Sequence, residues 1–303
     1  MLLLVLFNSC ISQSSSNNDL REPIGQKAID SNVIQFDTLP TLDTLKIMGT
    51  SVDSVGKDTI EKTKKWAFRE INDSIRNALN KRPKHIYLSF DDGPLIGSRA
   101  IDSIISARNI KISAFLIGKH AHMSKHLMKS YKRYYDNPLV DCYNHSFTHA
   151  NNRFQTFYSN PQKAFEDFEK NELDLELKHK IVRMPGRNIW YFNEMRRVDL
   201  NSGASTAEML YNNGYKIYGW DVEWRINGIT GKPVQTVDQV YTRIKNYMNN
   251  KSSLVPNNVV LLMHDDMFQH MSGQIQLSAL LDSLQKHPDY HFEFLKDYPF
   301  VYN

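Results

Sequence analysis

Between residues 85 and 295, short runs of apolar residues alternate with stretches in which apolar residues recur every three or four positions. The short runs predict buried strands, and the recurring pattern predicts amphipathic helices. This alternation is typical of a mostly parallel sheet covered by helices, and seven strands favour closure into a barrel, although spacing alone also admits an open sheet. The predicted strands are HIYLSF (85–90), IKISAFLIG (110–118), LVDCYNH (139–145), IVRMPG (181–186), YKIYGWDVEW (215–224), NVVLLMHD (258–265) and HFEFL (291–295).

The chain before residue 85 has a different pattern. From residue 11 to about 59 it is rich in Ser, Asn, Asp and Thr, and its apolar residues follow no sustained period, which predicts a mostly irregular tether. Between residues 60 and 80 the apolar residues form one stripe at helical spacing, and Pro83 marks the end of that helix. We therefore expect a tether over 11–59, a helical extension over 60–84, and one α/β domain over 85–303.

The first ten residues, MLLLVLFNSC, are an apolar run that ends at Cys10. This run is too short to span a bilayer, and no later segment approaches the roughly 20 apolar residues that spanning requires. It resembles the signal of a bacterial lipoprotein, in which the cysteine is lipidated, although no basic residue follows Met1. The resemblance implies an exported, cell-envelope lipoprotein that meets the membrane only through a lipid anchor at Cys10. Cys142 would then have no disulfide partner.

Composition and charge narrow the class of protein. The chain has 303 residues, of which 41% are hydrophobic and 23% charged, so it can bury a core of its own. Its formal net charge of +4 is modest, and the basic excess is concentrated between Glu61 and His85. We interpret that basic run as the solvated face of a helix, and we expect no nucleic-acid partner.

Polar residues follow the carboxyl ends of most predicted strands. In sheets of this class, functional side chains gather at that edge. Each of these residues is ordinary alone, but together they supply carboxylates, imidazoles and a guanidinium at one rim. They are Asp91 and Asp92 after the first strand, His145 and His149 after the third, Arg183 in the fourth, Asp221 and Glu223 in the fifth, and His264 in the sixth.

His145 and His149 are four residues apart, so a single turn can aim both imidazoles at one point. Two histidines and a carboxylate are a typical ligand set for a catalytic divalent metal, with zinc as the default. The spacing alone is weak support, because the chain has eleven histidines and the same spacing recurs at His122 and His126. We expect His122 to be a surface or loop residue, together with His120, Asp265, Asp266 and His270.

The adjacent Asp91 and Asp92 admit two interpretations. Asp, Gly and Pro favour turns, so DDGP can be a plain turn. Alternatively, one carboxylate binds a metal while its neighbour takes a proton from the metal-bound water. In the second interpretation the metal and Arg183 supply the positive charge that keeps both carboxylates ionised.

Five motifs occur in the order and at the strand ends that characterise a known family: SFDDGP, NHSFTH, RMPG, WDVEW and LLMH. From His85 to the C-terminus the chain resembles the polysaccharide deacetylase family, the NodB homology domain of carbohydrate esterase family 4. The resemblance implies a distorted (β/α)7 barrel, preceded here by the irregular and helical extension. This agrees with the seven strands counted from the apolar pattern.

By position, the resemblance also implies roles for single residues. It implies that Asp92, His145 and His149 hold a divalent metal, most simply Zn²⁺, with Co²⁺, Mn²⁺ or Ni²⁺ as alternatives. It further makes Asp91 the general base, His264 the general acid that protonates the leaving amine, and Arg183 the residue that orients the catalytic aspartate.

Two motifs depart from the family pattern. Most members have Tyr after Pro185, where this chain has Gly186; the backbone N–H used for the oxyanion survives, and the aromatic ring is lost. The WDVEW motif is shorter than usual, so either Asp221 or Glu223 could tune His264, and Glu223 is preferred because it directly precedes a tryptophan. The candidate substrate contacts are Pro185 and that tryptophan, Trp224, although an aromatic residue is more often simply buried.

The implied activity is hydrolysis of N-acetyl groups on an amino-sugar polymer or oligosaccharide, such as peptidoglycan or chitin. Within the same class, the alternative is an esterase that removes O-acetyl groups from xylan. From another class, the alternative is a non-catalytic sugar-binding lipoprotein on the same barrel, because the third and fourth motifs are altered. Metal-dependent phosphoester hydrolysis is less favoured, since it usually needs a second ligand cluster.

Overall fold

The structure is a computed structural model, and it describes residues 57–199 and 201–299. The predicted signal segment with Cys10, and most of the predicted tether, lie outside the described residues. The described part divides into two units, which are treated separately: helix α2 (Lys57–Asn80) and the domain from residue 82 onward. Helix α2 confirms the helix predicted from the apolar stripe. None of the helices in the described ranges is long and apolar enough to cross a membrane.

The domain contains one ten-stranded sheet. Its strands follow one another in the order β6-β5-β7-β4-β3-β2-β1-β9-β8, and β10 pairs with the start of β1. All pairs are parallel except those of β5 with β6 and with β7. The strands are β1 (Lys84–Gly93), β2 (Ile112–Leu116), β3 (Val140–Asn144), β4 (Ile181–Val182), β5 (Trp190–Phe192), β6 (Met195–Arg197), β7 (Lys216–Ile217), β8 (Val222–Glu223), β9 (Asn258–His264) and β10 (Tyr290–Phe292).

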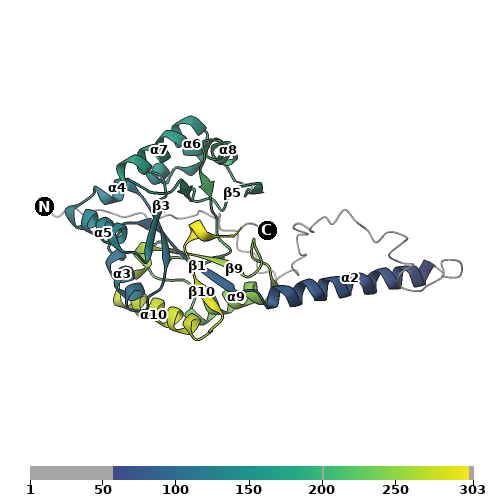
Figure 1. The fold of residues 1–303 in the computed structure, drawn as a ribbon. Helices are drawn as coiled ribbons and strands as arrows, with labels where there is room; N and C mark the ends of the chain where they lie inside the picture. Colours follow the sequence, from purple (N-terminus) through teal and green to yellow (C-terminus); the bar gives the residue numbers. More distant parts are fainter. Residues whose placement is uncertain (1–56, 200, 300–303) are drawn as a thin grey trace. The chain divides into compact units, whose positions relative to one another are not determined.

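Helices lie between most of the parallel strands and cover the outside of the sheet (Figure 1). Their apolar faces pack on the outward-facing strand residues, as the three-to-four residue periodicity predicts. The helices are α3 (Ser98–Ser106), α4 (Gly118–Ala121), α5 (Lys125–Asp136), α6 (Phe154–Tyr158), α7 (Pro161–Asp174), α8 (Ala204–Asn212), α9 (Val237–Asn250) and α10 (Met271–Gln285), with short 3-10 turns η2 (His149–Asn152), η3 (Asp265–Phe268) and η4 (Leu295–Asp297).

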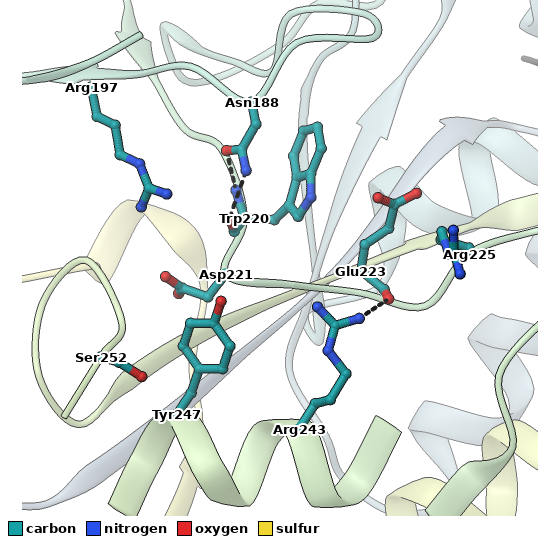
Figure 2. Close-up of a pocket in the computed structure, with 9 residues that line it drawn as sticks. All are labelled: Asn188, Arg197, Trp220, Asp221, Glu223, Arg225, Arg243, Tyr247 and Ser252. Atoms are coloured by element: carbon teal, nitrogen blue, oxygen red, sulfur yellow. Dashed lines mark hydrogen bonds between the residues drawn. The ribbon is translucent and has the colours of Figure 1, made fainter. Parts of the chain in front are cut away.

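The segment 215–224 crosses from one side of the sheet to the other. Near its start the Tyr218 N–H donates to the Val182 carbonyl at 3.0 Å, and further on the Asp221 N–H donates to the Val260 carbonyl at 3.0 Å. The strand predicted here therefore divides into β7, beside β4, and β8, beside β9, with the crossing residues between them (Figure 2). The fold is a distorted α/β barrel, as predicted, and β8 has a strand partner on one side only among the described strands.

The strand alternation separates two cores. On β1, Leu88 and Phe90 face the helices, whereas Tyr87 belongs to an aromatic cluster inside the barrel. Ser89 and Asp91 share the face of Tyr87, since successive strand residues point to opposite sides. The same alternation turns the polar residues at the carboxyl ends of β3, β4 and β9 toward the interior.

Candidate metal centre and active site

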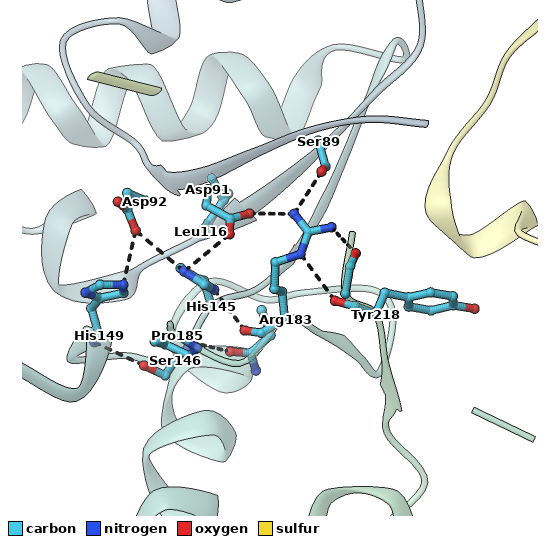
Figure 3. A network of polar contacts seen from close by, with 12 residues as sticks. Ser89, Asp91, Asp92, Leu116, His145, Ser146, His149, Arg183, Pro185 and Tyr218 are labelled. Atoms are coloured by element: carbon cyan, nitrogen blue, oxygen red, sulfur yellow. Dashed lines mark hydrogen bonds and ion pairs between the residues drawn. The ribbon is translucent and has the colours of Figure 1, made fainter. Parts of the chain in front are cut away.

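Three predicted ligands meet at the carboxyl end of the barrel (Figure 3). The Asp92 Oδ1 atom lies 3.2 Å from His149 Nε2 and 3.5 Å from His145 Nε2. One ligand atom from each residue lies within 4.8 Å of the other two, and all three side chains are largely buried. The structure therefore brings together Asp92, His145 and His149, which come from two separate loops.

The second nitrogen of each imidazole is engaged elsewhere. His145 Nδ1 donates to the Arg183 carbonyl at 2.8 Å, and His149 Nδ1 donates to Asn152 Oδ1 at 3.1 Å. These bonds fix the ring orientation and the tautomer, so that both Nε2 atoms face Asp92. The Asp92 Oδ1 atom is buried and has no hydrogen-bond partner within the described ranges. A buried acceptor beside two aligned Nε2 atoms is the donor set that a divalent metal requires.

The backbone explains how two adjacent aspartates reach the same site. Residues that follow one another in a regular strand point to opposite faces. At the end of β1 the register with β2 shifts between Phe90 and Gly93, and Asp92 has a φ of 70°. This left-handed residue breaks the alternation, so Asp91 and Asp92 both approach His145.

Arg183 anchors Asp91 from inside the barrel. Its Nη1 donates to Asp91 Oδ1 and to Ser89 Oγ, both at 2.8 Å, while Nε and Nη2 donate to the carbonyls of Tyr218 and Gly219. The guanidinium is fully buried, and its central carbon lies 4.2 Å from the centre of the Phe115 ring. The other Asp91 oxygen lies 3.7 Å from His145 Nε2. Asp91 is thus held beside Asp92, His145 and His149, outside the group of side chains that could hold a metal.

The pKa values of His145 and His149 shift in opposite directions. Burial alone would raise the pKa of Asp92, but the neighbouring His149 and His145 outweigh it and hold that pKa well below its usual range. Burial lowers the pKa of His149 to about 4, so this imidazole is neutral near pH 7. For His145, burial is outweighed by Asp91 and Asp92, and the pKa is raised. A proton and a metal would therefore compete at His145.

His264 ends β9 in register with Asp91 on β1. Its Nδ1 atom is buried and has no hydrogen-bond partner in the described part of the chain. Its charge acts on Asp92 and lowers the pKa of that carboxyl, after the effects of burial and of the two other histidines. His264 therefore belongs to the same site as the three ligands.

Asp221 does not contact His264, which argues against it as the acid that tunes this histidine. Its two oxygens accept the N–H groups of Leu254 and Val260, at 3.1 and 2.9 Å. It lies level with Val260, about 13 Å before His264 along the strand at roughly 3.3 Å per residue. Glu223 pairs with Leu262 and is the nearer of the two acids, but no contact joins it to His264 among the described residues.

Two predicted substrate contacts are wrong. Trp224 is fully buried, it packs against Phe268, and its indole N–H donates to the Gln235 carbonyl, so its ring belongs to the core and is closed to a sugar. Pro185 is also buried, with its carbonyl accepting the Tyr158 hydroxyl. The exposed residue of that loop is Gly186, whose N–H has no partner in the described ranges.

Phe154 lies where Gly186 lacks a side chain. A Cβ atom on Gly186 would meet three carbons of the Phe154 ring at 3.3 Å. The same ring stands edge-on to the His149 imidazole, with 5.5 Å between the ring centres. An aromatic ring from another loop therefore borders the site near the position where the family motif carries Tyr. Sequence alone gave no reason to select this phenylalanine from the fifteen in the chain.

Asp265 and His120, expected to be surface or loop residues, are buried or partly buried and contact the loop that carries Asp92. Asp265 is fully buried and accepts the hydroxyls of Ser98 and Tyr134, and burial raises its pKa to about 8. A Cβ atom on Gly93 would lie 2.8 Å from its Oδ2, so this glycine permits the close approach. His120 Nδ1 donates to the Asp92 carbonyl at 2.7 Å. The sequence did contain a signal for Asp265: a second pair of Asp residues follows an apolar strand, as Asp91 and Asp92 do.

Known proteins can now be compared with this geometry. A family model described as polysaccharide deacetylase matches residues 78–189. This stretch of the chain is similar to polysaccharide deacetylases. The match includes both metal-binding motifs and Arg183, and it ends before Glu223 and His264. A curated relative named "Putative polysaccharide deacetylase YheN", from Bacillus subtilis (strain 168), is 23% identical over 74% of this chain and 71% of its own length.

Solved structures support the deacetylase fold. The catalytic domain of peptidoglycan N-acetylglucosamine deacetylase from Eubacterium rectale aligns with a TM-score of 0.51 and 20% identity, over 74% of this chain and 94% of that one. A family 4 carbohydrate esterase pseudoenzyme from Bacillus anthracis also aligns with a TM-score of 0.51, with 16% identity over 71% of this chain and 65% of that one. Since an enzyme and a pseudoenzyme share this fold, activity must be argued from the site.

Proposed function

We propose that the protein is a metal-dependent hydrolase that removes N-acetyl groups from an amino-sugar polymer or oligosaccharide. The observation that carries the proposal is the buried, unpartnered Asp92 Oδ1 facing the Nε2 atoms of His145 and His149. Burying a carboxylate oxygen without a hydrogen-bond partner costs free energy of folding, and a bound cation would offset this cost.

The residues fit a divalent metal. Asp92, His145 and His149 would hold it, and zinc suits a ligand set of two imidazoles and one carboxylate, with Co²⁺, Mn²⁺ or Ni²⁺ as alternatives. When bound, such an ion supplies a water molecule of lowered pKa and polarises a carbonyl group.

The chain's own residues account for the proton transfers. Water adds to the acetyl carbonyl carbon, and Asp91, held by Arg183, accepts its proton. The exposed Gly186 N–H donates to the carbonyl oxygen as negative charge develops there. His264 then gives a proton to the sugar nitrogen as the C–N bond breaks, so the products are acetate and a free amine.

The main alternative within this class is hydrolysis of O-acetyl esters. An alkoxide leaves more readily than an amide nitrogen, so an ester needs less help from a general acid. A His264→Ala variant should lose activity on N-acetylated substrates and keep it on acetate esters if both are accepted. Equal losses on both substrates would contradict the assigned role of His264.

The alternative from another class is a sugar-binding protein without activity. The presence of both aspartates, both histidines, Arg183 and His264 in one site argues against it. The test is acetate release from chitin, peptidoglycan and xylan fragments, measured together with metal content, for the wild type and Asp92→Asn. Asp174→Asn is the matched control, because Asp174 pairs with His122 at 2.7 Å on the surface. Wild-type protein that binds metal and releases no acetate from any fragment would overturn the proposal.

The proposal includes export and a lipid anchor. Both are inferred from the apolar run that ends at Cys10, which lies outside the described residues. A Cys10→Ala variant should fail to incorporate labelled fatty acid and should leave the membrane fraction. Unchanged labelling would remove the anchor from the proposal without affecting the enzymatic part.

A further inference from the structure

A polar cavity of about 400 Å³ lies along the free edge of β8. Its walls come from β6, from the crossing segment between β7 and β8, and from helix α9 (Figure 2). Trp220 lines this cavity, and its ring also lies 5.8 Å from the guanidinium carbon of Arg183. The side chains of Trp220 and Arg183 therefore link the cavity to Asp91.

Three arginines line the cavity. Arg197 comes from β6, Arg225 follows β8, and Arg243 belongs to α9, and all three are exposed. No carboxylate forms an ion pair with any of them within the described ranges, and the one polar contact is a 3.4 Å bond from Arg243 to the Glu223 carbonyl. Guanidinium groups in such an arrangement favour a bound oxyanion, because their forks match carboxylate geometry.

The acids in the cavity neutralise these charges only in part. Both oxygens of Asp221 accept backbone N–H groups, from Leu254 and Val260, and the residue is buried. Glu223 is the one other acid that lines the cavity. Burial raises the pKa of Asp221 to about 6, and the nearby Arg197 acts against this shift. Two carboxylates therefore face three guanidinium groups, which leaves a smaller excess of positive charge.

The cavity also offers a fixed aromatic surface. The Asn188 side chain accepts the Trp220 N–H and donates to the Trp220 carbonyl, both at 3.0 Å, which holds the backbone of this residue in place. Trp220 is only partly buried, unlike Trp224. An indole ring beside guanidinium groups and a free carboxylate suits a sugar ring that carries both hydroxyl groups and a negative charge.

We propose that this cavity binds a carboxylate-bearing saccharide unit, so that the polymer recognised by the protein is acidic rather than neutral. The assignment rests on the proposed function, since it names the substrate class for the same barrel. It adds Arg197, Arg225 and Arg243 as residues that determine specificity and lie outside the metal centre.

Calorimetric titration of the full chain tests the assignment. The ligands are a tetrasaccharide of alternating N-acetylglucosamine and N-acetylmuramic acid, a neutral tetrasaccharide of N-acetylglucosamine, and inorganic phosphate, with EDTA present to stop turnover. The proteins are the wild type, Arg197→Gln, Arg243→Gln and the control Arg196→Gln. Arg196 is the exposed neighbour of Arg197 on the same strand, but it lies over the Tyr191 ring at 5.3 Å and does not line the cavity.

The wild type should bind the acidic tetrasaccharide at least about tenfold more tightly than the neutral one, the difference expected for one charge-assisted contact. Arg197→Gln and Arg243→Gln should each abolish this preference, Arg196→Gln should retain it, and added salt should weaken it. Equal binding of both tetrasaccharides by the wild type would overturn the assignment. So would an equal loss in Arg196→Gln, or binding of phosphate that the acidic tetrasaccharide does not displace.

Acetate release from the two tetrasaccharides, measured in parallel with metal present, separates the two proposals. If binding of the acidic tetrasaccharide depends on Arg197 but neither substrate releases acetate, the proposed saccharide site stands and the proposed hydrolase activity is refuted. If both substrates release acetate at equal rates and Arg197→Gln has no effect, the proposed hydrolase activity stands and the proposed saccharide site is refuted.

Discussion

Asp91 and His264 occupy paired positions on the neighbouring parallel strands β1 and β9. Paired residues of adjacent strands point to the same face, and the strands lie about 4.8 Å apart. The proposed base and the proposed acid can therefore act on one bond from adjacent positions, with the metal ligands on the loops beside them. Asp91 is tied to Arg183, whereas the Nδ1 of His264 has no partner in the described part of the chain.

This arrangement predicts that Asp91 acts in proton transfer and not in metal binding. An Asp91→Asn variant should retain the metal, because Asp92, His145 and His149 remain, while kcat falls by about 10²- to 10⁴-fold through loss of the base. Acetate release and metal content measured on the same preparation check this. A variant that loses its metal would show that Asp91 is a ligand and would refute the assigned roles.

Arg183 is expected to be as important for stability as for activity. An Arg183→Lys variant keeps the charge but cannot make the four side-chain hydrogen bonds of the buried guanidinium. We expect a loss of about 3–5 kcal/mol in the free energy of unfolding, measured by urea denaturation, since a buried ion pair is disrupted. Arg187→Lys is the control, because Arg187 bonds to Ser202 and Gly186 in a less buried position and should lose much less. Similar losses in the two variants would contradict the anchoring role.

Metal affinity should fall as the pH is lowered. Asp91 and Asp92 raise the pKa of His145 despite its burial, so a proton and the metal compete for its Nε2 atom increasingly as the pH falls. The neutral His149, with a pKa of about 4, should contribute little to this dependence above pH 5. Zinc titrations between pH 8 and pH 5.5 should show progressively weaker binding and proton release on binding. An affinity that does not change over this range would refute the competition.

Gly186 is expected to be required for both its backbone conformation and its missing side chain. Its φ is +66°, and an added Cβ would lie 3.3 Å from the Phe154 ring, which borders His149. Gly186→Ala should therefore cost about 1 kcal/mol or more of stability and also lower activity, by displacing that ring. Gly214→Ala is the matched control, because its φ is +85° and its nearest neighbour lies at 3.9 Å. It should show the loss of stability with unchanged activity, and an equal loss of activity in both variants would count against a role for Phe154.

The sequence predicted the parts of this domain that local patterns determine. The strand ends at Asp91, His145, Arg183 and His264 could be found because short apolar runs predict buried strands, and a parallel sheet places their carboxyl ends at one rim. The three ligands meet as the motif spacing indicates. The described residues thus confirm the barrel and the grouping of the site.

The features that the sequence analysis missed depend on contacts between distant segments of the chain. The β5–β6 hairpin was missed because its strands have three residues each, too few to show an alternation. Trp224 was misassigned, and Asp221 stayed open as the alternative to Glu223, because neighbouring positions around the short strand β8 differ in the face they present and in their register with β9. The position of Phe154 beside the site became visible only once its neighbour Gly186 was placed in space.

Asp265 offers a test of the buried network beneath the metal loop. Its pKa is about 8 in the folded protein and 3.8 for a free side chain, so the folded state holds a proton that the unfolded state has released. The resulting stabilisation is complete below pH 4 and is lost as the pH rises through 8. Asp221 and Asp266 act in the same direction but only up to about pH 6, and the raised pKa of His145 affects the wild type and an Asp265 variant alike, so the difference between the two proteins from pH 6.5 to 8.5 reports Asp265. In metal-free protein, the wild type should lose thermal stability across this range more steeply than Asp265→Asn, whose amide does not titrate. Equal slopes for the two proteins would mean that the Asp265 carboxyl is ionised inside the fold, with Ser98 and Tyr134 bonded to a buried charge.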